Sequence, residues 1–306
     1  MESVMVSDLV SVVITTYGRS DTLKRAIKSV LKQTYQNLEI IIVDDNANEE
    51  KNIEVENIIE SINDPRIRLI QNKKNMGGAL ARNEGIYASN AEFVAFLDDD
   101  DQYLPLKIEK ELKVLKKNEK VALVYCWENL IGKGEKVSGS NKKSIRGNCL
   151  YEAMQDCIAA TSLWLCRKKA LLDVGGFTDT PCKQDSYVIL KLLINGYELD
   201  FVPEILSLYG DDLPDRISTQ GHEKRIVGEE NLRKLCREHY SLINLKEQKY
   251  VEYCFGSRLA EHYLAVGRYQ EAFDSGIKIC KHPFNGMTRA CIRGTIRVLL
   301  KGKLRK

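Results

Sequence analysis

The chain has 306 residues, of which 43% are hydrophobic and 29% charged, and its formal net charge is +3. This length and apolar content predict a globular protein with one large domain or two unequal ones. The small net charge gives no support for a polyanionic partner such as nucleic acid. Nine cysteines without a C-x-x-C pair are expected to be reduced thiols of a cytoplasmic protein. No apolar run reaches about 18 residues, so we expect no membrane-spanning helix, and the first residues do not resemble a secretion signal.

The first 126 residues alternate between apolar strands and amphipathic helices. The run 10–15 is almost continuous in β-branched residues, which is typical of a strand buried on both faces of a parallel sheet. A helix capped by Ser20 or Asp21 follows, and then a strand at 39–43. Further strands are expected at 66–70, 92–97 and 121–126, and further helices at 53–62, at 78–88 and from Pro105. Strand–helix–strand units of this kind predict a mainly parallel, doubly wound sheet.

The rest of the chain is less regular. Residues 131–148 are rich in small polar and basic residues, which predicts a mobile basic loop. We expect strands at 162–166, 198–202 and 205–209, a tight turn at 175–177, a helix at 187–194 and only helices from His222 onward.

The C-terminal tail is strongly basic. Nine lysines and arginines follow Asp274, and no acidic residue does. A helix in residues 287–306 would suit either an anionic membrane surface or packing on its own domain, and both alternatives stay open. Aromatic residues are not interleaved with the basic ones, so we expect no nucleic-acid partner.

Four consecutive aspartates, Asp98 to Asp101, follow the apolar run 93–97. Adjacent like charges repel, so a fold tolerates them where a cation or hydrogen bonds compensate. In extended backbone Asp98 and Asp100 point to one side and Asp99 to the other, and paired carboxylates suit Mg²⁺ or Mn²⁺. A solvated acidic turn is the alternative. Thr15 to Tyr17 and the pair Asp44 and Asp45 follow two other strands, and ligands of open α/β sheets bind at such strand ends.

Several stretches together resemble the family-two glycosyltransferases of the GT-A fold. They are VSVVITTYGRSDTLKRAIKSVLKQTYQNLEIIIVDDNANEE, NMGGALARNEGI, FVAFLDDDDQYLP, and GGF followed by QDSYVILKLLINGYE. The resemblance implies an α/β GT-A domain over residues 1–218, with a donor-binding half (1–126) and an acceptor half (127–218). Residues 219–306 would form a helical C-terminal extension.

The resemblance also implies roles for individual residues. Those expected to bind the nucleotide-sugar are Thr15, Tyr17, Asp44, Asp45, Asn75, Gly78, Arg82, Asp98 and Asp99. Asp100 and Asp98 would hold Mn²⁺ or Mg²⁺, although the sequence does not decide how the roles divide among Asp98, Asp99 and Asp100. Asp101 would introduce the next helix. Asp185 matches the general base, although Gln184 replaces the glutamate that usually precedes it. Each of three features also has a purely structural alternative. Asp44 and Asp45 could form a turn, Gly78 could only start a helix, and Asp185 could be a helix N-cap.

The implied activity is transfer of one hexose or N-acetylhexosamine, with inversion, from a UDP-sugar to a hydroxyl of a glycan or lipid-linked glycan. Surface-polysaccharide synthesis at the inner face of the plasma membrane would fit this activity. A processive synthase is disfavoured, because its Q-x-x-R-W segment is absent. The absence of G-x-G-x-x-G and of G-x-x-x-x-G-K-[ST] argues against dinucleotide enzymes and P-loop NTPases. A non-catalytic nucleotide-binding or assembly protein on the same fold remains the alternative.

Overall fold

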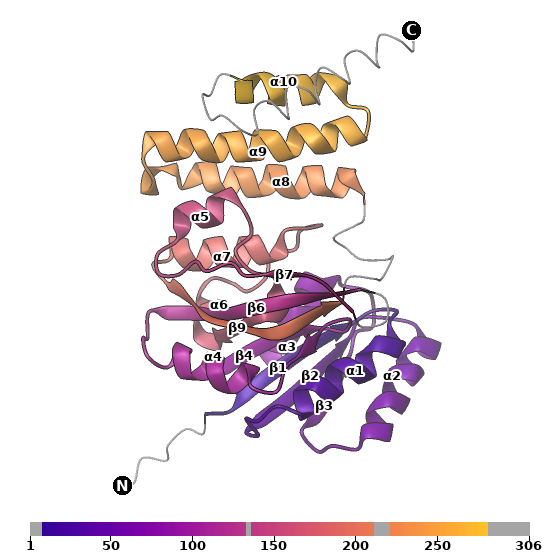
Figure 1. Cartoon of the computed structure of the whole chain (residues 1–306). Coiled ribbons are helices and arrows are strands. Elements are labelled where there is room, and N and C mark those ends of the chain that lie inside the picture. Colours follow the sequence, from indigo (N-terminus) through magenta and orange to yellow (C-terminus); the bar gives the residue numbers. More distant parts are fainter. Residues whose placement is uncertain (1–7, 133–135, 211–220, 281–306) are drawn as a thin grey trace. The chain divides into compact units, whose positions relative to one another are not determined.

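The computed structural model describes residues 8–132, 136–210 and 221–280 (Figure 1). The chain divides into two compact units, each of which is made of segments that are separate in the sequence. The first, called the sheet unit, comprises Met1–Cys149, Ile158–Asp179 and Tyr187–Leu213; the second, called the helical unit, comprises Leu150–Cys157, Thr180–Ser186 and Pro214–Lys306. The division predicted at residue 218 lies outside the described residues and stays a prediction.

The sheet unit is built on one mixed sheet. Its strands are β1 (Val10–Thr16), β2 (Leu38–Asp44), β3 (Ile67–Gln71), β4 (Phe93–Asp98), β5 (Gln102–Tyr103), β6 (Val121–Gly132), β7 (Lys136–Asn141), β8 (Trp164–Arg167) and β9 (Glu198–Gly210). Within the described residues they form a nine-stranded sheet of order β3-β2-β1-β4-β8-β6-β9-β5, with β7 paired to β6. Pairing is parallel from β3 through β4, whereas β8 is antiparallel to both of its neighbours. The order reverses between β1 and β4, and this reversal opens a binding position at the strand ends.

Helices connect these strands where the sequence predicts them, but neither Ser20 nor Asp21 caps the first helix, which begins at Ser20 and has Arg19 as its N-cap residue. They are α1 (Ser20–Leu31), α2 (Glu49–Ile62), α3 (Gly78–Ala88), α4 (Lys107–Leu115), α6 (Lys168–Asp173) and α7 (Gln184–Ile194), and the 3₁₀ helix η2 covers Thr161–Leu163. The first three residues of α7 belong to the helical unit and the others to the sheet unit. Helix α3 lies unusually close to β1, since a Cβ on Gly85 would be 2.3 Å from a methyl carbon of Val13. Glycine at this position therefore fixes the helix that carries Arg82.

Three sequence predictions in this unit need correction. The expected loop 131–148 is partly strand, because β6 runs on to Gly132 and pairs with β7. The two strands expected at 198–202 and 205–209 are one strand, β9, whose pairing with β6 shifts register after Val202. The strand expected at 162–166 begins only at Trp164, after η2.

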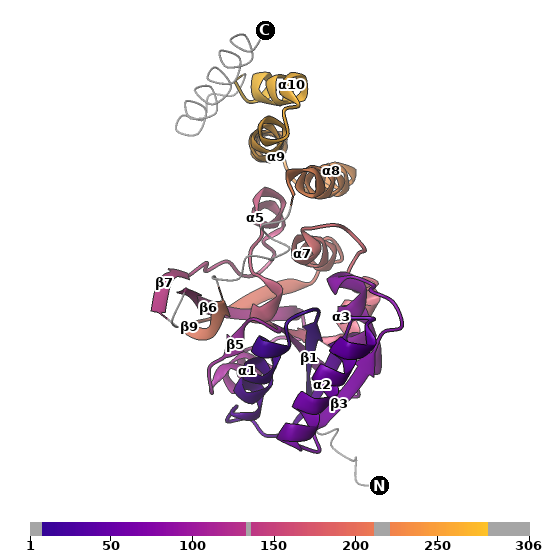
Figure 2. The ribbon, with the colours of Figure 1, turned by 90° about the vertical axis from the view of Figure 1, so that its right-hand side faces the viewer.

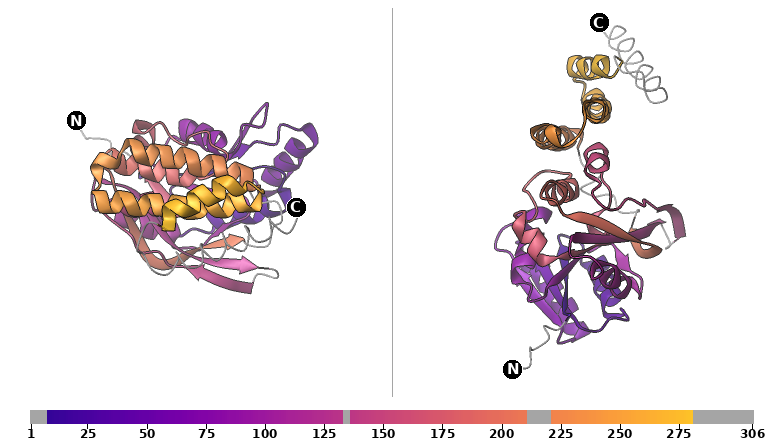
Figure 3. Two further views of the ribbon diagram at one scale, coloured as in Figure 1. Left: turned by 90° about the horizontal axis from the view of Figure 1, so that it is seen from above. Right: turned by 90° about the vertical axis from the view of Figure 1, so that its left-hand side faces the viewer.

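The helical unit contains α5 (Leu150–Gln155), α8 (His222–Glu238), α9 (Leu245–Ala265) and α10 (Tyr269–Cys280), with the 3₁₀ helix η4 (Tyr240–Leu242) between α8 and α9. Helices α8, α9 and α10 lie side by side, as the end-on view shows (Figure 2) and the view from above supports (Figure 3). Asn244 and Glu247 form a capping box that starts α9. Apolar packing joins the three helices through Ile226, Leu259, Tyr263 and Ala272. The prediction of helices from His222 is confirmed as far as Cys280, and the basic segment 287–306 lies outside the described residues.

Seven cysteines of the described residues form no disulfide bond, and four of them are buried. None of the helices in the described ranges is long and apolar enough to cross a membrane.

A buried ion pair lies beneath the sheet on α4. Lys107 and Glu111 are both 0% exposed, and their charged atoms are 2.7 Å apart. At pH 8, where the Glu111 carboxyl is ionised, Glu111→Gln would leave the Lys107 ammonium buried without its counter-charge, so we expect a loss of about 3–5 kcal/mol in the free energy of unfolding. The double variant Lys107→Met/Glu111→Leu removes both charges and is expected to be as stable as the parent, or more stable by about 1–4 kcal/mol.

The same pair makes stability depend on pH. Burial raises the pKa of the Glu111 carboxyl to about 7 from an ordinary value of 4.5, although Lys107 acts in the opposite direction. Between these values the folded chain holds a proton that the unfolded chain releases, so this group lowers stability as the pH rises through that window. Urea unfolding at pH 5 and pH 8 should show this decrease in the parent and a smaller one in the double variant. A decrease of equal size in both proteins would contradict the assignment to Glu111.

Candidate active site

Three parallel strands bring polar residues to one edge of the sheet. Thr16 on β1 is in register with Asp44 on β2, and Thr15 with Asp98 on β4. Thr15 is half-buried, whereas Tyr17 just beyond is 60% exposed. An exposed ring at the end of a strand can stack on a planar ligand such as a nucleobase.

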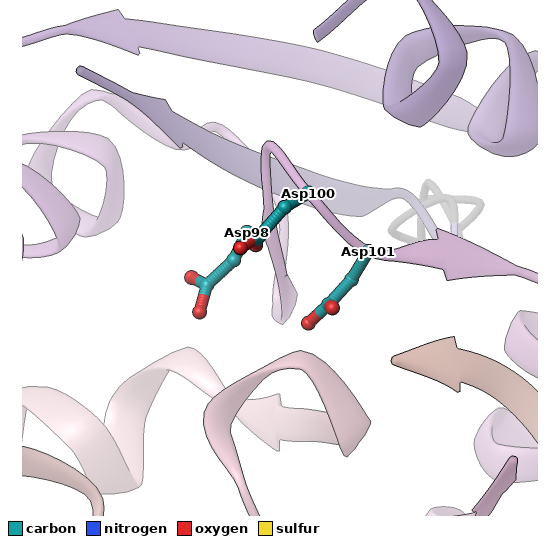
Figure 4. A group of neighbouring side chains, drawn as sticks. All are labelled: Asp98, Asp100 and Asp101. Carbon is teal, nitrogen blue, oxygen red and sulfur yellow. The ribbon is translucent and has the colours of Figure 1, made fainter. Parts of the chain in front are cut away.

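The aspartate run forms a tight turn after β4, closed by a hydrogen bond from the Asp101 N–H to the Asp98 carbonyl oxygen, 3.1 Å long. One carboxylate oxygen from each of Asp98, Asp100 and Asp101 lies within 4.8 Å of the other two (Figure 4). Asp98 and Asp100 thus lie close together, although in a turn and not in the extended backbone that the prediction assumed. Three hard oxygen donors at this spacing fit a divalent cation such as Mg²⁺ or Mn²⁺.

Asp101 differs from its prediction. It does not introduce the next helix, because α4 begins only at Lys107 and β5 lies between them. Its side chain is buried, and its Oδ1 accepts a 3.0 Å hydrogen bond from the Gly210 N–H at the end of β9. Burial, reinforced by the charge of Asp100, raises the pKa of the Asp101 carboxyl well above its ordinary value. A bound cation would relieve this repulsion among the three carboxylates.

Asp99 points the other way, toward β1. Its Oδ2 accepts hydrogen bonds from the Thr16 hydroxyl (2.7 Å) and the Tyr17 N–H (3.3 Å). Burial raises the pKa of this carboxyl to about 7, against the opposing effect of the Thr16 hydrogen bond. Asp99 thus ties the loop that carries Tyr17 to the aspartate turn, which leaves it outside the group of three possible metal ligands.

Two arginines offset the negative charge of the aspartates. Arg82 of α3 is buried, donates to Asp98 Oδ1 over 2.5 Å and stacks over the Phe177 ring at 5.5 Å. Arg19 lies 3.2 Å from Asp99 and 2.9 Å from Asp100. Both guanidinium groups therefore reach the edge where the chain could hold a diphosphate. Arg82 was predicted as a donor-binding residue but Arg19 was not, although Arg19 follows Tyr17 by only two residues.

Asp45 holds the loop that follows β3. Its carboxylate accepts from the Asn72 side chain and from the N–H groups of Met76 and Gly77, at 2.8–2.9 Å. A carboxylate has about four acceptor positions, so this one retains capacity for a nucleobase N–H. Asn75 in the loop is exposed and accepts from the Gly77 N–H, and Gly78 begins α3.

Asp44 has a structural role. It is fully buried, and its Oδ1 accepts from the backbone and side-chain nitrogens of Asn46, at 3.0 and 2.7 Å. Burial raises its pKa despite these hydrogen bonds. The carboxylate therefore supports the turn after β2, which was the structural alternative, and its role in binding stays a prediction.

Asp185 belongs to the helical unit, in the first turn of α7. Its Oδ1 accepts from the Ser186 N–H at 2.6 Å, and the Cys157 thiol donates to its Oδ2 at 3.2 Å. It lies inside the helix, which begins at Gln184, and therefore is not the N-cap residue. The predicted donor-binding and metal residues all lie in the sheet unit.

Residues 11–174 match the sequence model of the glycosyl transferase family 2. This match covers more than half of the chain and includes the aspartate turn. The chain belongs to glycosyl transferase family 2. The resemblance noted in the sequence is thereby confirmed.

Curated relatives of this family match part of the chain. An uncharacterized glycosyltransferase of Rickettsia bellii is 34% identical over 149 residues, which are 48% of this chain and 21% of that protein. A protein of Escherichia coli, UDP-Glc:alpha-D-GlcNAc-diphosphoundecaprenol beta-1,3-glucosyltransferase WfgD, is 36% identical over 117 residues, or 38% of this chain and 44% of that protein. The chain spans less than half the length of either relative.

Solved structures of other proteins share the fold of this chain. TarS residues 1–349 of S. aureus in complex with UDP-GlcNAc has a TM-score of 0.59 at 15% identity and covers 89% of this chain and 91% of its own. The mannosyltransferase PcManGT of Pyrobaculum calidifontis, in complex with GDP-Man and Mn²⁺, has a TM-score of 0.59 at 20% identity, with coverages of 97% and 87%. At these identities the likeness shows the fold, and the predicted GT-A architecture is confirmed.

Proposed function

We propose that this chain transfers a single sugar from a UDP-sugar to a hydroxyl group of an acceptor, with inversion at the anomeric carbon. The observation that carries the proposal is the cluster of Asp98, Asp100 and Asp101 at the end of β4, beside the reversal of strand order. Three carboxylates so close together repel one another and would destabilise the fold, unless they bind a cation together with a charged ligand.

Residues of the sheet unit would bind the donor. Tyr17 offers its exposed ring to the uracil, Asp45 retains an acceptor position for the uracil N–H, and Thr15 and Asn75 line the same edge. Asp99 would take a ribose hydroxyl. Arg82 and Arg19 would donate to diphosphate oxygens, since a guanidinium donates two parallel hydrogen bonds.

Asp98 and Asp100, with Asp101, would hold Mn²⁺ or Mg²⁺. When bound, such an ion offsets the charge that develops on the departing diphosphate. Asp185 would accept the proton of the acceptor hydroxyl while that oxygen attacks the anomeric carbon from the face opposite the diphosphate. A single displacement of this kind inverts the configuration.

A panel of nucleotide-sugars tests the proposal. We expect UDP-sugars to release UDP slowly in the presence of Mn²⁺, with one hexose or N-acetylhexosamine preferred, and GDP-mannose to be a poor donor. Release should be measured with and without EDTA, and the anomeric configuration of the newly released sugar should be determined by NMR before it mutarotates. Preference for a GDP-sugar, or retention of configuration, would contradict the proposal.

We propose a lipid-linked glycan as the acceptor, as in polysaccharide synthesis. The support is chemical: the printed name of the relative WfgD describes a diphosphoundecaprenol-linked acceptor, and nine basic residues follow Asp274 in this chain. Such a tail suits the anionic inner face of a membrane, at about 1 kcal/mol per basic residue. Flotation with phosphatidylglycerol liposomes should therefore weaken when the chain is cut after Asp274, and flotation unchanged by the cut would contradict membrane association.

A further inference from the structure

The segment that carries Asp185 has a strained backbone. Lys183 has a φ of 64°, in the left-handed region that favours glycine. A non-glycine residue keeps such a conformation only where surrounding contacts hold it, and such strain concentrates at functional sites. Thr180–Ser186 belongs to the helical unit, so the contacts that hold it can be followed within that unit.

Glu229 of α8 is the centre of these contacts. Its side chain is 0% exposed, and its Oε1 lies 2.9 Å from the Lys183 ammonium. Arg258 of α9 donates from Nε to both carboxylate oxygens at 2.9 Å. One buried carboxylate therefore balances two cations, one of them in the strained segment, and its loss would leave both without that counter-charge.

Helix α8 also approaches the segment closely. A Cβ on Gly228 would lie 2.2 Å from the Cys182 sulfur and 3.3 Å from the Cys182 carbonyl oxygen. Any larger residue would force the Cys182 sulfur to move and would crowd the Cys182 carbonyl oxygen. Glycine at 228 and glutamate at 229 thus bring α8 against the two residues just before Gln184 and Asp185.

The same network reaches the other neighbour of Asp185. Arg258 donates from its Nη1 to the Gln155 carbonyl oxygen at 2.5 Å, and Gln155 ends α5. Two residues later, the Cys157 thiol donates to Asp185 Oδ2 at 3.2 Å. Arg258 therefore connects Glu229, which pairs with Lys183, to the end of α5, two residues before Cys157.

We propose that Glu229 is a positioning residue for sugar transfer: through Lys183 and Arg258 it fixes the segment Thr180–Ser186 and hence the Asp185 carboxylate. The inference rests on the proposed role of Asp185 as base. A base must lie within hydrogen-bond reach of the proton that it removes, and a displacement of about 1 Å can lower a rate about 10²-fold. The C-terminal helices are then part of the catalytic apparatus.

Glu229→Gln in the full chain tests the proposal, with UDP release from UDP-glucose and UDP-GlcNAc as the measured reaction. We expect kcat to fall about 10- to 100-fold while KM and UDP affinity stay within about twofold. Hydrogen exchange of the amides of residues 182–186 is expected to accelerate. Gly228→Ala should act in the same direction, since the added methyl group displaces Cys182.

Glu252→Gln is the matched control. Glu252 on α9 accepts from Arg233 and Arg237 of α8, so this variant also breaks a carboxylate–arginine contact between α8 and α9. It should lose stability but keep kcat and the exchange rates of residues 182–186. An equal fall in kcat in the control would overturn positioning in favour of general loosening.

Unchanged kcat and unchanged exchange in Glu229→Gln would also overturn the proposal. Lys183→Met keeps the Glu229–Arg258 pair and gives the same test if Glu229→Gln does not fold. Asp185→Asn, measured in parallel, separates the proposed role of Asp185 as base from the proposed role of Glu229 in positioning it. Normal turnover of Asp185→Asn would refute the base itself, whereas a large loss there with no effect at Glu229 would refute only the positioning.

Discussion

Replacing Asp185 with asparagine is expected to lower sugar transfer by about 10²- to 10⁴-fold, which is the range that general base catalysis contributes. Asparagine has nearly the shape of aspartate, and its side-chain oxygen can still accept from the Ser186 N–H that aspartate now binds at 2.6 Å. The first turn of α7 should therefore persist. What the variant loses is a group that can accept the proton of the acceptor hydroxyl.

The measurements are UDP release and calorimetric UDP binding in Mn²⁺. UDP affinity should stay within about twofold of the parent, because the proposed nucleotide contacts lie in the sheet unit. Asp173→Asn is the control: this aspartate is on the surface of α6, where it pairs with Lys169 and accepts from the Tyr197 hydroxyl. The control should keep full activity. Near-normal turnover in Asp185→Asn would place the base at another residue.

The sequence predicted the parallel half of the sheet well, because strands buried on both faces are nearly continuous apolar runs. Val12, Ile41 and Phe96 on its three central strands are each at most 1% exposed. The hairpin of β6 and β7 was missed for the opposite reason. Residues 136–141 are small, polar or charged and mostly exposed, so their strand conformation depends on pairing with β6 rather than on a pattern of their own.

Only those features of the candidate site that depend on neighbouring residues in the sequence could be predicted. The sequence predicted that the aspartate run follows β4, but it did not assign separate roles to Asp98, Asp99 and Asp100, whose side chains are oriented by the turn. The position of Asp101 was not accessible in this way, because it depends on the Gly210 N–H, 109 residues further along the chain. Likewise, nothing in the local sequence of Asp185 points to Glu229, since their connection runs through tertiary ion pairs.

UDP affinity is expected to increase at least tenfold when Mn²⁺ replaces EDTA, a coupling free energy of about 1.4 kcal/mol or more. The physical reason is that three clustered carboxylates repel a diphosphate unless a cation lies between them. Calorimetric titration of UDP in the two conditions measures the effect. Equal affinity in both would contradict a metal-dependent donor site.

Single asparagine replacements then test the role of each aspartate in binding Mn²⁺ and UDP. Asp100→Asn should abolish most of the Mn²⁺ effect, because Asp100 belongs to the cluster of three, and Asp98→Asn should reduce it while also removing the carboxylate that Arg82 binds. Asp99→Asn should weaken UDP binding equally with and without Mn²⁺, since Asp99 is turned toward Thr16 and the Tyr17 backbone. A loss of the Mn²⁺ effect in Asp99→Asn, with the effect intact in Asp100→Asn, would reverse this assignment. The side of the turn that each carboxylate occupies would then not decide its role, and ligand binding would have to rearrange the turn.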